Sequence, residues 1–162
     1  MIDNEVKNLV DFYYSLKLPD FNEDTKVEEV RQMMKEFSKN ASQIASPSLL
    51  EIKDHSLPMS FGDLLVRGYY PKNASTSCPI VYLRGSGFVI DNFSDSDFFC
   101  AKLANACQSS VLSIDYPLAP EHPYPQAIEA TKYALKWIVN QGELFNVQMS
   151  DLILIGESSG GC

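Results

Sequence analysis

Histidine and cysteine are scarce in this chain of 162 residues, and neither is clustered. The two histidines are His55 and His122, and the four cysteines form no C-x-x-C pair and no group with histidine. Zinc sites and disulfide frameworks need closely spaced ligands or paired cysteines. We therefore expect no metal site and no disulfide framework. If the chemistry needs an imidazole base, two positions in the sequence could supply it.

Positive charge and long apolar runs are missing as well. Lysine and arginine number 13 against 21 acidic residues, and the net charge of −8 disfavours nucleic acid or an anionic membrane as a partner. No apolar run approaches the roughly 20 residues of a membrane span. The first residues lack the basic and apolar regions of a signal peptide. The sequence thus predicts a cytoplasmic protein without stable membrane insertion, and it leaves the oligomeric state open.

Residues 1–46 carry helical patterns and no strand pattern. Apolar side chains recur three and four positions apart in residues 4–17, which predicts an amphipathic helix. Thr25 to Glu28 is a capping box, and an apolar stripe follows it as far as Ala41. Packing against a core is the favoured role of that stripe, and a lipid-facing lid is the alternative.

The rest of the chain shows short strands that alternate with helices. Strands are expected at Leu49–Lys53, Asp63–Tyr70, Ile80–Leu83, Val111–Ile114 and Leu152–Ile155, and a turn at Pro58–Gly62 separates the first two. Two helices are expected: one from an N-cap at Ser94 to Cys107, and one from about Pro125 to Asn140. Strand, helix, strand, helix and strand in that order predict an α/β fold: a right-handed, mainly parallel twisted sheet with helices on both faces.

A short motif follows the last predicted strand. Gly156-Glu157-Ser158-Ser159-Gly160 matches the G-x-S-x-G pattern of a nucleophile elbow, in which a serine sits on a sharp strand-to-helix turn. The glycines are needed because the flanking backbone passes too close for a Cβ. A non-catalytic Gly/Ser turn is the alternative, and the position directly after a strand favours the elbow.

A glycine-rich turn, Arg84-Gly85-Ser86-Gly87-Phe88, follows the first central strand. Backbone N–H groups in such a turn could hold a phosphate or an oxyanion, because ligands bind at the carboxyl ends of parallel strands. The turn lacks the G-K-[ST] and G-x-G-x-x-G patterns of phosphate loops. Together with a serine elbow it favours an oxyanion hole.

A proline-rich run, Asp115-Tyr-Pro-Leu-Ala-Pro-Glu-His-Pro-Tyr-Pro125, follows the second central strand. Its four prolines predict a rigid loop that leads into the next helix. Asp115, Glu121 and His122 could act as an acid or a base. The favoured interpretation is that they hold the loop by hydrogen bonds.

The three motifs, in this order and at close to these spacings, resemble the hormone-sensitive-lipase-like carboxylesterases of the α/β-hydrolase fold. The corresponding family patterns are H-G-G-G-F, D-Y-R-L-A-P-E-x-P-x-P and G-D-S-A-G-G. The resemblance covers roughly residues 49–162. It implies an incomplete α/β-hydrolase core over residues 47–162, with residues 1–46 contributing helices to a cap. It also implies hydrolysis of a small acyl ester through a serine acyl-enzyme, with no metal and no cofactor.

The resemblance also implies a role for each matching residue. Ser158 would be the nucleophile, and His122 would belong to a structural loop rather than serve as the base. The remaining roles would be the N–H groups of Ser86, Gly87 and Ser159 as oxyanion donors, Arg84 and Gly85 as the oxyanion loop, and Gly156, Glu157 and Gly160 as the elbow.

The sequence departs from the family in three ways. Arg84 replaces the usual histidine, and Ser86 replaces a glycine, at a cost of about 1–2 kcal/mol if that position needs a positive φ. The acid and base of the family follow the elbow, where this sequence has no residues. We therefore expect the N-terminal part of a longer enzyme that is truncated after the elbow, inactive alone, with Leu152–Ile155 as an uncovered apolar edge prone to aggregation.

Two alternatives remain open. One is a non-catalytic ligand-binding protein on the same fold, which the changed residues Arg84 and Ser86 would suit. The other is an inactive truncated remnant. The reading frame beyond residue 162 separates them: an Asp and a His at the family positions favour the enzyme, a frame without His favours the binding protein, and an early stop favours the remnant.

Overall fold

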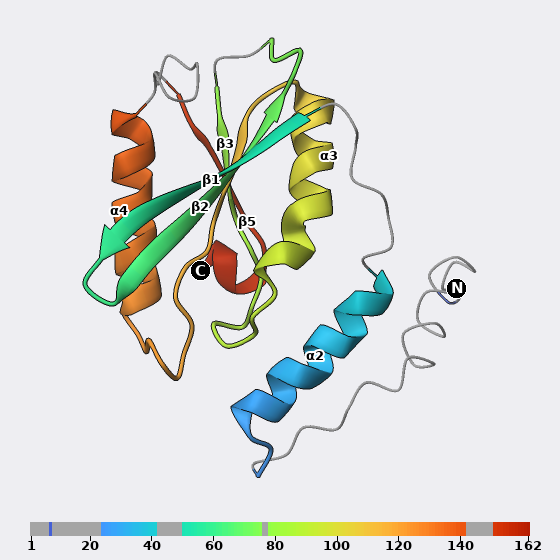
Figure 1. Cartoon of the computed structure of the whole chain (residues 1–162), viewed down its shortest axis with the longest axis vertical. Helices are drawn as coiled ribbons and strands as arrows, with labels where there is room; N and C mark the ends of the chain where they lie inside the picture. Colours follow the sequence, from blue (N-terminus) through green and yellow to red (C-terminus); the bar gives the residue numbers. More distant parts are fainter. Residues whose placement is uncertain (1–6, 8–23, 42–49, 76–77, 142–150) are drawn as a thin grey trace.

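The computed structural model describes residue 7 and residues 24–41, 50–75, 78–141 and 151–162 (Figure 1). The helices and strands in these ranges are α2 (Val27–Ala41), β1 (Leu50–Met59), β2 (Gly62–Pro71), β3 (Ile80–Leu83), η1 (Phe93–Ser96), α3 (Asp97–Cys107), β4 (Val111–Ile114), α4 (Gln126–Asn140), β5 (Ile153–Gly156) and η3 (Ser158–Gly161). None of the helices in these ranges has the length and apolarity needed to span a bilayer. The helix expected in residues 4–17 lies outside the described residues.

The five strands form one mixed sheet in the order β1-β2-β4-β3-β5. The central strand β3 pairs in parallel with β4 on one side and with β5 on the other. β1 and β2 form an antiparallel hairpin that joins β4, also antiparallel. The three parallel strands end on the same side of the sheet, so the loops that follow β3, β4 and β5 converge at their carboxyl ends.

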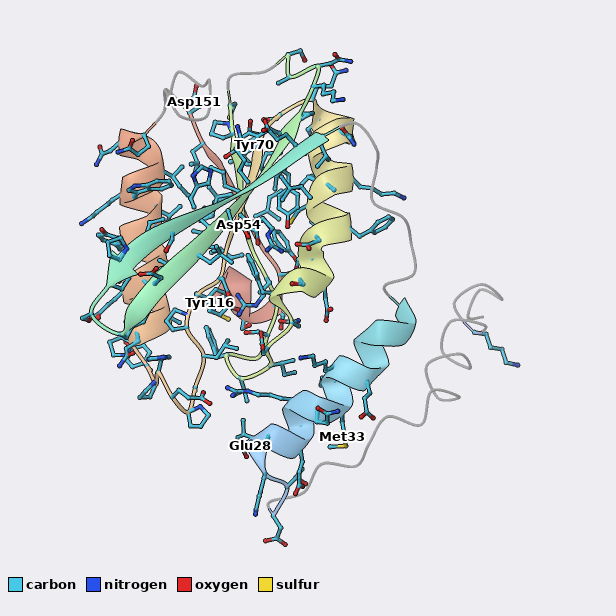
Figure 2. All side chains as sticks on the ribbon, in the orientation of Figure 1. Glu28, Met33, Asp54, Tyr70, Tyr116 and Asp151 are labelled. Carbon is cyan, nitrogen blue, oxygen red and sulfur yellow. The ribbon has the colours of Figure 1, made fainter. Side chains whose placement is uncertain are left out.

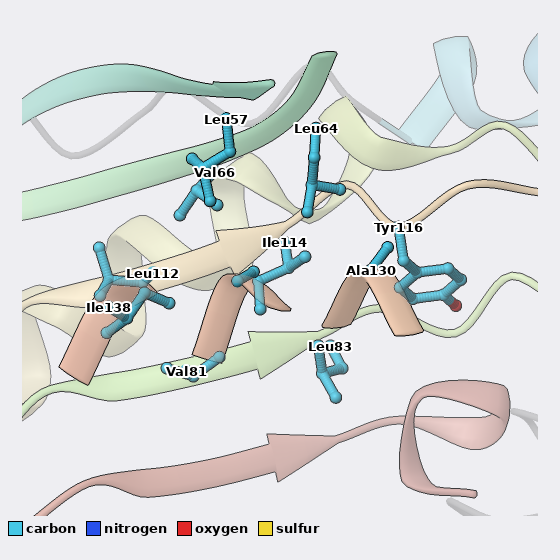
Figure 3. Packing of buried hydrophobic residues seen from close by; sticks show 11 residues of the cluster. Leu57, Leu64, Val66, Val81, Leu83, Leu112, Ile114, Tyr116, Ala130 and Ile138 are labelled. Carbon is cyan, nitrogen blue, oxygen red and sulfur yellow. The ribbon is translucent and has the colours of Figure 1, made fainter. Parts of the chain in front are cut away.

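Helices cover both faces of the sheet, as expected for an α/β fold (Figure 1). On one face, alternate residues of β3, Val81 and Leu83, pack in a cluster with buried residues of α4 such as Ala130 (Figure 3). On the other face, Ile80 and Tyr82 pack with buried residues of α3. Both faces of the central strands are therefore apolar, which explains why their sequences read as continuous apolar runs.

The structure corrects three of the expected boundaries. β1 continues to Met59, so Pro58 lies within the strand rather than in the turn. Proline is tolerated there because β1 is an edge strand, where an N–H can face away from the ladder. Ser94 is not the N-cap of a long helix: it lies in η1, and α3 begins only at Asp97. β5 runs one residue later than expected.

β5 forms the second edge of the sheet in the described residues. Ile153 and Leu154 are 48% and 52% exposed. This agrees with the expected uncovered apolar edge. Its tendency to aggregate remains a prediction.

Candidate active site

The backbone at Ser158 is strained, as the elbow expected from the sequence would require. Ser158 follows β5 with φ at 48°, in the left-handed region that residues with a Cβ rarely adopt. A Cβ on Gly160 would overlap the carbonyl oxygen of Leu83, and one on Gly156 would overlap the carbonyl oxygen of Gly160. Glycine is therefore required at both positions, and the Ser158 side chain is presented at the surface.

The loop after β3 lies directly against the elbow. The Ser86 N–H donates to Ser159 Oγ at 2.9 Å, and a Cβ on Gly85 would lie 3.1 Å from the Cβ of Ser158. Gly87 and Phe88 follow with positive φ values of 56° and 61°. The loop that begins at Arg84 and the loop that carries Ser158 thus meet in space, as the order of the motifs predicted.

Ser86 fits its position without the strain considered above. Ser86 does not have a positive φ. The left-handed positions of this loop are the next two residues, Gly87 and Phe88. The Ser86 Oγ accepts a hydrogen bond from the Phe88 N–H at 3.0 Å and lies 2.8 Å from the Tyr116 hydroxyl. The serine side chain therefore stabilises the turn that follows it.

Arg84 occupies the position of the usual histidine as a buried charge, with 1% of its surface exposed. Its guanidinium pairs with the Asp115 carboxylate at 2.9 Å, donates to Asn92 Oδ1 at 3.2 Å, and stacks on the Tyr116 ring at 4.5 Å from the centroid. Burial raises the pKa of Asp115, and the charge of Arg84 opposes that shift. Arg84 therefore ties the loop after β3 to the loop after β4.

Two residues of this network were not singled out from the sequence. The Tyr116 hydroxyl donates to the carbonyl of Arg84 at 2.7 Å and lies 3.3 Å from Ser159 Oγ; Figure 2 shows Tyr116 beside the C-terminal turn. Asn92 Nδ2 donates to the carbonyl of Gly85 at 2.9 Å. Tyr116 stands next to Asp115 in the proline-rich motif, which was a usable signal, whereas nothing in the sequence marks Asn92.

Glu157, which precedes Ser158, is anchored to the neighbouring strand β3. The Tyr82 hydroxyl of β3 donates to Glu157 Oε2 at 2.6 Å, and the Glu157 N–H donates to the carbonyl of Leu83 at 3.1 Å. Burial, followed by this hydrogen bond, raises the pKa of Tyr82, so its hydroxyl stays protonated and remains a donor.

Arg31 of α2 connects the N-terminal helix to both loops of the site. Its guanidinium donates to the carbonyls of Val89 and Ala119 at 2.8 and 3.0 Å, and it pairs with both carboxylate oxygens of Glu121. The hydrogen bond from Arg31 lowers the pKa of Glu121 to about 2. Glu121 therefore holds the proline-rich loop in place, in agreement with the structural role favoured from the sequence.

Both histidines bond to groups away from Ser158. His55 lies on β1, at the opposite edge of the sheet from β5, where Nε2 is 3.0 Å from the Tyr70 hydroxyl. Burial lowers the pKa of His55. His122 Nδ1 is 2.9 Å from Gln126 Oε1. Within the described ranges no group of three or more histidine, cysteine or acidic side chains could hold a metal ion.

A mixed α/β sheet with a strained serine after one of its parallel strands and a glycine-rich loop beside it defines an α/β-hydrolase. The profile of the α/β hydrolase fold matches residues 80–162. The chain belongs to this family, among its hormone-sensitive-lipase-like carboxylesterases.

Named relatives and a solved structure agree with this assignment. The chain is 32% identical to the esterase LipI of Mycobacterium tuberculosis over 141 residues, which are 85% of this chain and 43% of that protein. It is 27% identical to an arylesterase of Saccharolobus solfataricus over 161 residues, 99% of this chain and 51% of that protein. A hyperthermophilic esterase from Pyrobaculum calidifontis superimposes with a TM-score of 0.85 at 28% identity, over 99% of this chain and 50% of that one. The chain thus spans about half the length of these relatives.

Proposed function

We propose that this chain supplies the nucleophile and the oxyanion donors of a carboxylic ester hydrolase. The observation that carries the proposal is the positive φ of Ser158 on an elbow that packs against the loop from Arg84. A serine is held in such a conformation at the nucleophile elbow of α/β-hydrolases. The esterase names of the relatives support the same class of reaction.

The proposed reaction is acyl transfer through Ser158. Its Oγ attacks the carbonyl carbon of a small acyl ester, the Oγ proton passes to a base, and the carbonyl oxygen becomes an oxyanion. N–H groups of Ser86, Gly87 and Ser159 donate to that oxygen. The alcohol leaves with a proton, and water then hydrolyses the acyl-enzyme.

The other residues of the site hold this geometry. Arg84 and Gly85 fix the start of the oxyanion loop, and Gly156, Glu157 and Gly160 shape the elbow. Residues 47–162 form the part of the hydrolase core present here. Residues 1–46 serve as a helical cap segment, a role supported by the bonds from Arg31 to both loops.

The acid and base of the triad are not among these 162 residues. His55 and His122 bond to Tyr70 and Gln126 instead of Ser158. Ester hydrolysis by a serine needs a base within hydrogen-bond reach of Oγ. The 162-residue chain alone therefore turns over no ester.

Binding of 4-fluorophenylboronic acid tests the nucleophile without requiring turnover. In its tetrahedral boronate form, boron exchanges one hydroxyl for Ser158 Oγ. The displaced hydroxyl and the serine proton leave together as water, and the remaining boron hydroxyls accept hydrogen bonds from the oxyanion donors. We expect Ser158→Ala to weaken binding about 100-fold or more, as for a transition-state mimic, by ¹⁹F NMR titration at pH 9. Ser109→Ala, which removes a hydroxyl bonded to the carbonyl of Cys78, is the control. Equal binding by Ser158→Ala would refute the proposal.

Hydrolysis of p-nitrophenyl acetate tests the absence of a base. The 162-residue chain is expected to release nitrophenol at the same rate as Ser158→Ala, because no described histidine contacts Ser158. A faster rate that disappears in Ser158→Ala would overturn this part of the proposal. His55→Gln and His122→Gln would then show which imidazole serves as the base.

A further inference from the structure

The side chain of Ser159 lies where a bound oxyanion would accept hydrogen bonds. Its Oγ accepts the N–H of Ser86 at 2.9 Å. Ser86 is 2% exposed, so this N–H needs an acceptor within the protein. The family pattern G-D-S-A-G-G has alanine at the position of Ser159, and alanine has no oxygen that could fill this place.

The surrounding hydroxyls form a consistent hydrogen-bond network that holds the Ser159 side chain. The Tyr116 hydroxyl donates to the carbonyl of Arg84 at 2.7 Å, which leaves its oxygen free to accept. Ser86 Oγ and Ser159 Oγ lie 2.8 and 3.3 Å from that oxygen, so both can donate to it. Ser159 Oγ can thereby accept from the Ser86 N–H while its own proton points to Tyr116.

We infer that the Ser159 hydroxyl occupies the Ser86 oxyanion donor and must turn away before an oxyanion binds there. The inference rests on the proposed function, since it assigns a second role to a residue of the same site. The backbone N–H of Ser159 is an oxyanion donor, whereas its side chain competes with the oxyanion for the donor of Ser86. Ser159 is partly exposed, so a displaced hydroxyl can reach water.

The size of the competition follows from the bond that is given up. A neutral intramolecular hydrogen bond changes an equilibrium by about 2- to 10-fold. An oxyanion that displaces Ser159 Oγ therefore binds about 2- to 10-fold more weakly than it would to the same site without this hydroxyl. Loss of the donor altogether would cost about 100-fold or more, so the competitor weakens the oxyanion hole without removing it.

Ser159→Ala tests the inference through two measurements on the 162-residue chain. We expect 4-fluorophenylboronic acid to bind about 2- to 10-fold more tightly, and the Ser86 amide to exchange its hydrogen at least about 3-fold faster because it loses its acceptor. Ser109→Ala loses one hydroxyl bonded to a backbone carbonyl elsewhere and should change neither.

The two measurements separate this inference from the proposed function. Unchanged or weaker boronate binding in Ser159→Ala, together with loss of binding in Ser158→Ala, would overturn the inference and leave the function standing. Ser86 exchange that is unchanged in Ser159→Ala would overturn it as well. If no variant binds the boronate, the proposed function fails, and faster Ser86 exchange confined to Ser159→Ala would still support occupation of the donor.

Discussion

Replacing Arg84 with methionine is expected to lower the free energy of unfolding by about 1–3 kcal/mol, because a partly buried carboxylate loses its charged partner. Methionine keeps much of the apolar volume but leaves Asp115 without its 2.9 Å partner. It also leaves Asn92 Oδ1 and the carbonyls of Ile114 and Tyr116 without a donor from this side chain. Urea unfolding of both chains measures the difference.

The loss in Arg84→Met should depend on pH, because burial already raises the pKa of Asp115 and Arg84 opposes that shift. Without Arg84 the folded-state pKa rises further above the unfolded value. The folded state then binds a proton more readily, so part of the lost stability returns as pH falls through that raised pKa. The double variant Arg84→Met/Asp115→Asn, which has no stranded carboxylate, should be more stable than Arg84→Met at neutral pH. A loss below about 1 kcal/mol, unaffected by pH or by Asp115→Asn, would contradict this role.

Replacing Gly160 with alanine is expected to disrupt the elbow. A Cβ there would overlap the carbonyl oxygens of Leu83 and Arg84, which are backbone atoms and cannot turn aside. Forcing them apart costs about 1–3 kcal/mol by analogy with overpacking, and it separates the end of β3 from Ser158. We expect both a lower free energy of unfolding in urea and loss of Ser158-dependent boronate binding.

The neighbouring glycine provides a matched control for this variant. A Cβ on Gly161 would make only an ordinary contact of 3.4 Å with the carbonyl oxygen of Gly156, and Gly161 has no positive φ. Gly161→Ala should therefore keep both stability and boronate binding. If Gly160→Ala also keeps both, the close packing of the elbow against β3 does not position Ser158.

The central strands and the strained turn at Ser158 could be predicted because their signals are local. β3 and β4 each bury both faces, so four consecutive apolar or small residues mark each strand from its first residue to its last. Ser158 comes shortly after the apolar residues of β5, and glycines flank it at fixed spacing. The edge strand β1 was underestimated because Asp54 and Ser56 are polar, and an edge strand leaves such side chains in solvent.

The connections between the loops could not be predicted, because they join segments far apart in sequence. Tyr116 reaches Ser159 across 43 positions, and Arg31 reaches Glu121 across 90. Propensity and periodicity describe neighbouring residues, and they contain no information about which loops become adjacent after folding. The geometry of Ser86 was also undetermined, since the left-handed conformation belongs to the next two residues, Gly87 and Phe88.

The backbone amide shifts of the chain during titration with 4-fluorophenylboronic acid test the central claim most directly. If an oxygen attached through boron to Ser158 Oγ lies in an oxyanion hole, the amide protons of Gly87 and Ser159 should show the largest shifts. Ser158→Ala should abolish both shifts. Shifts centred on the His122 loop, or shifts at Gly87 and Ser159 that persist in Ser158→Ala, would contradict the account.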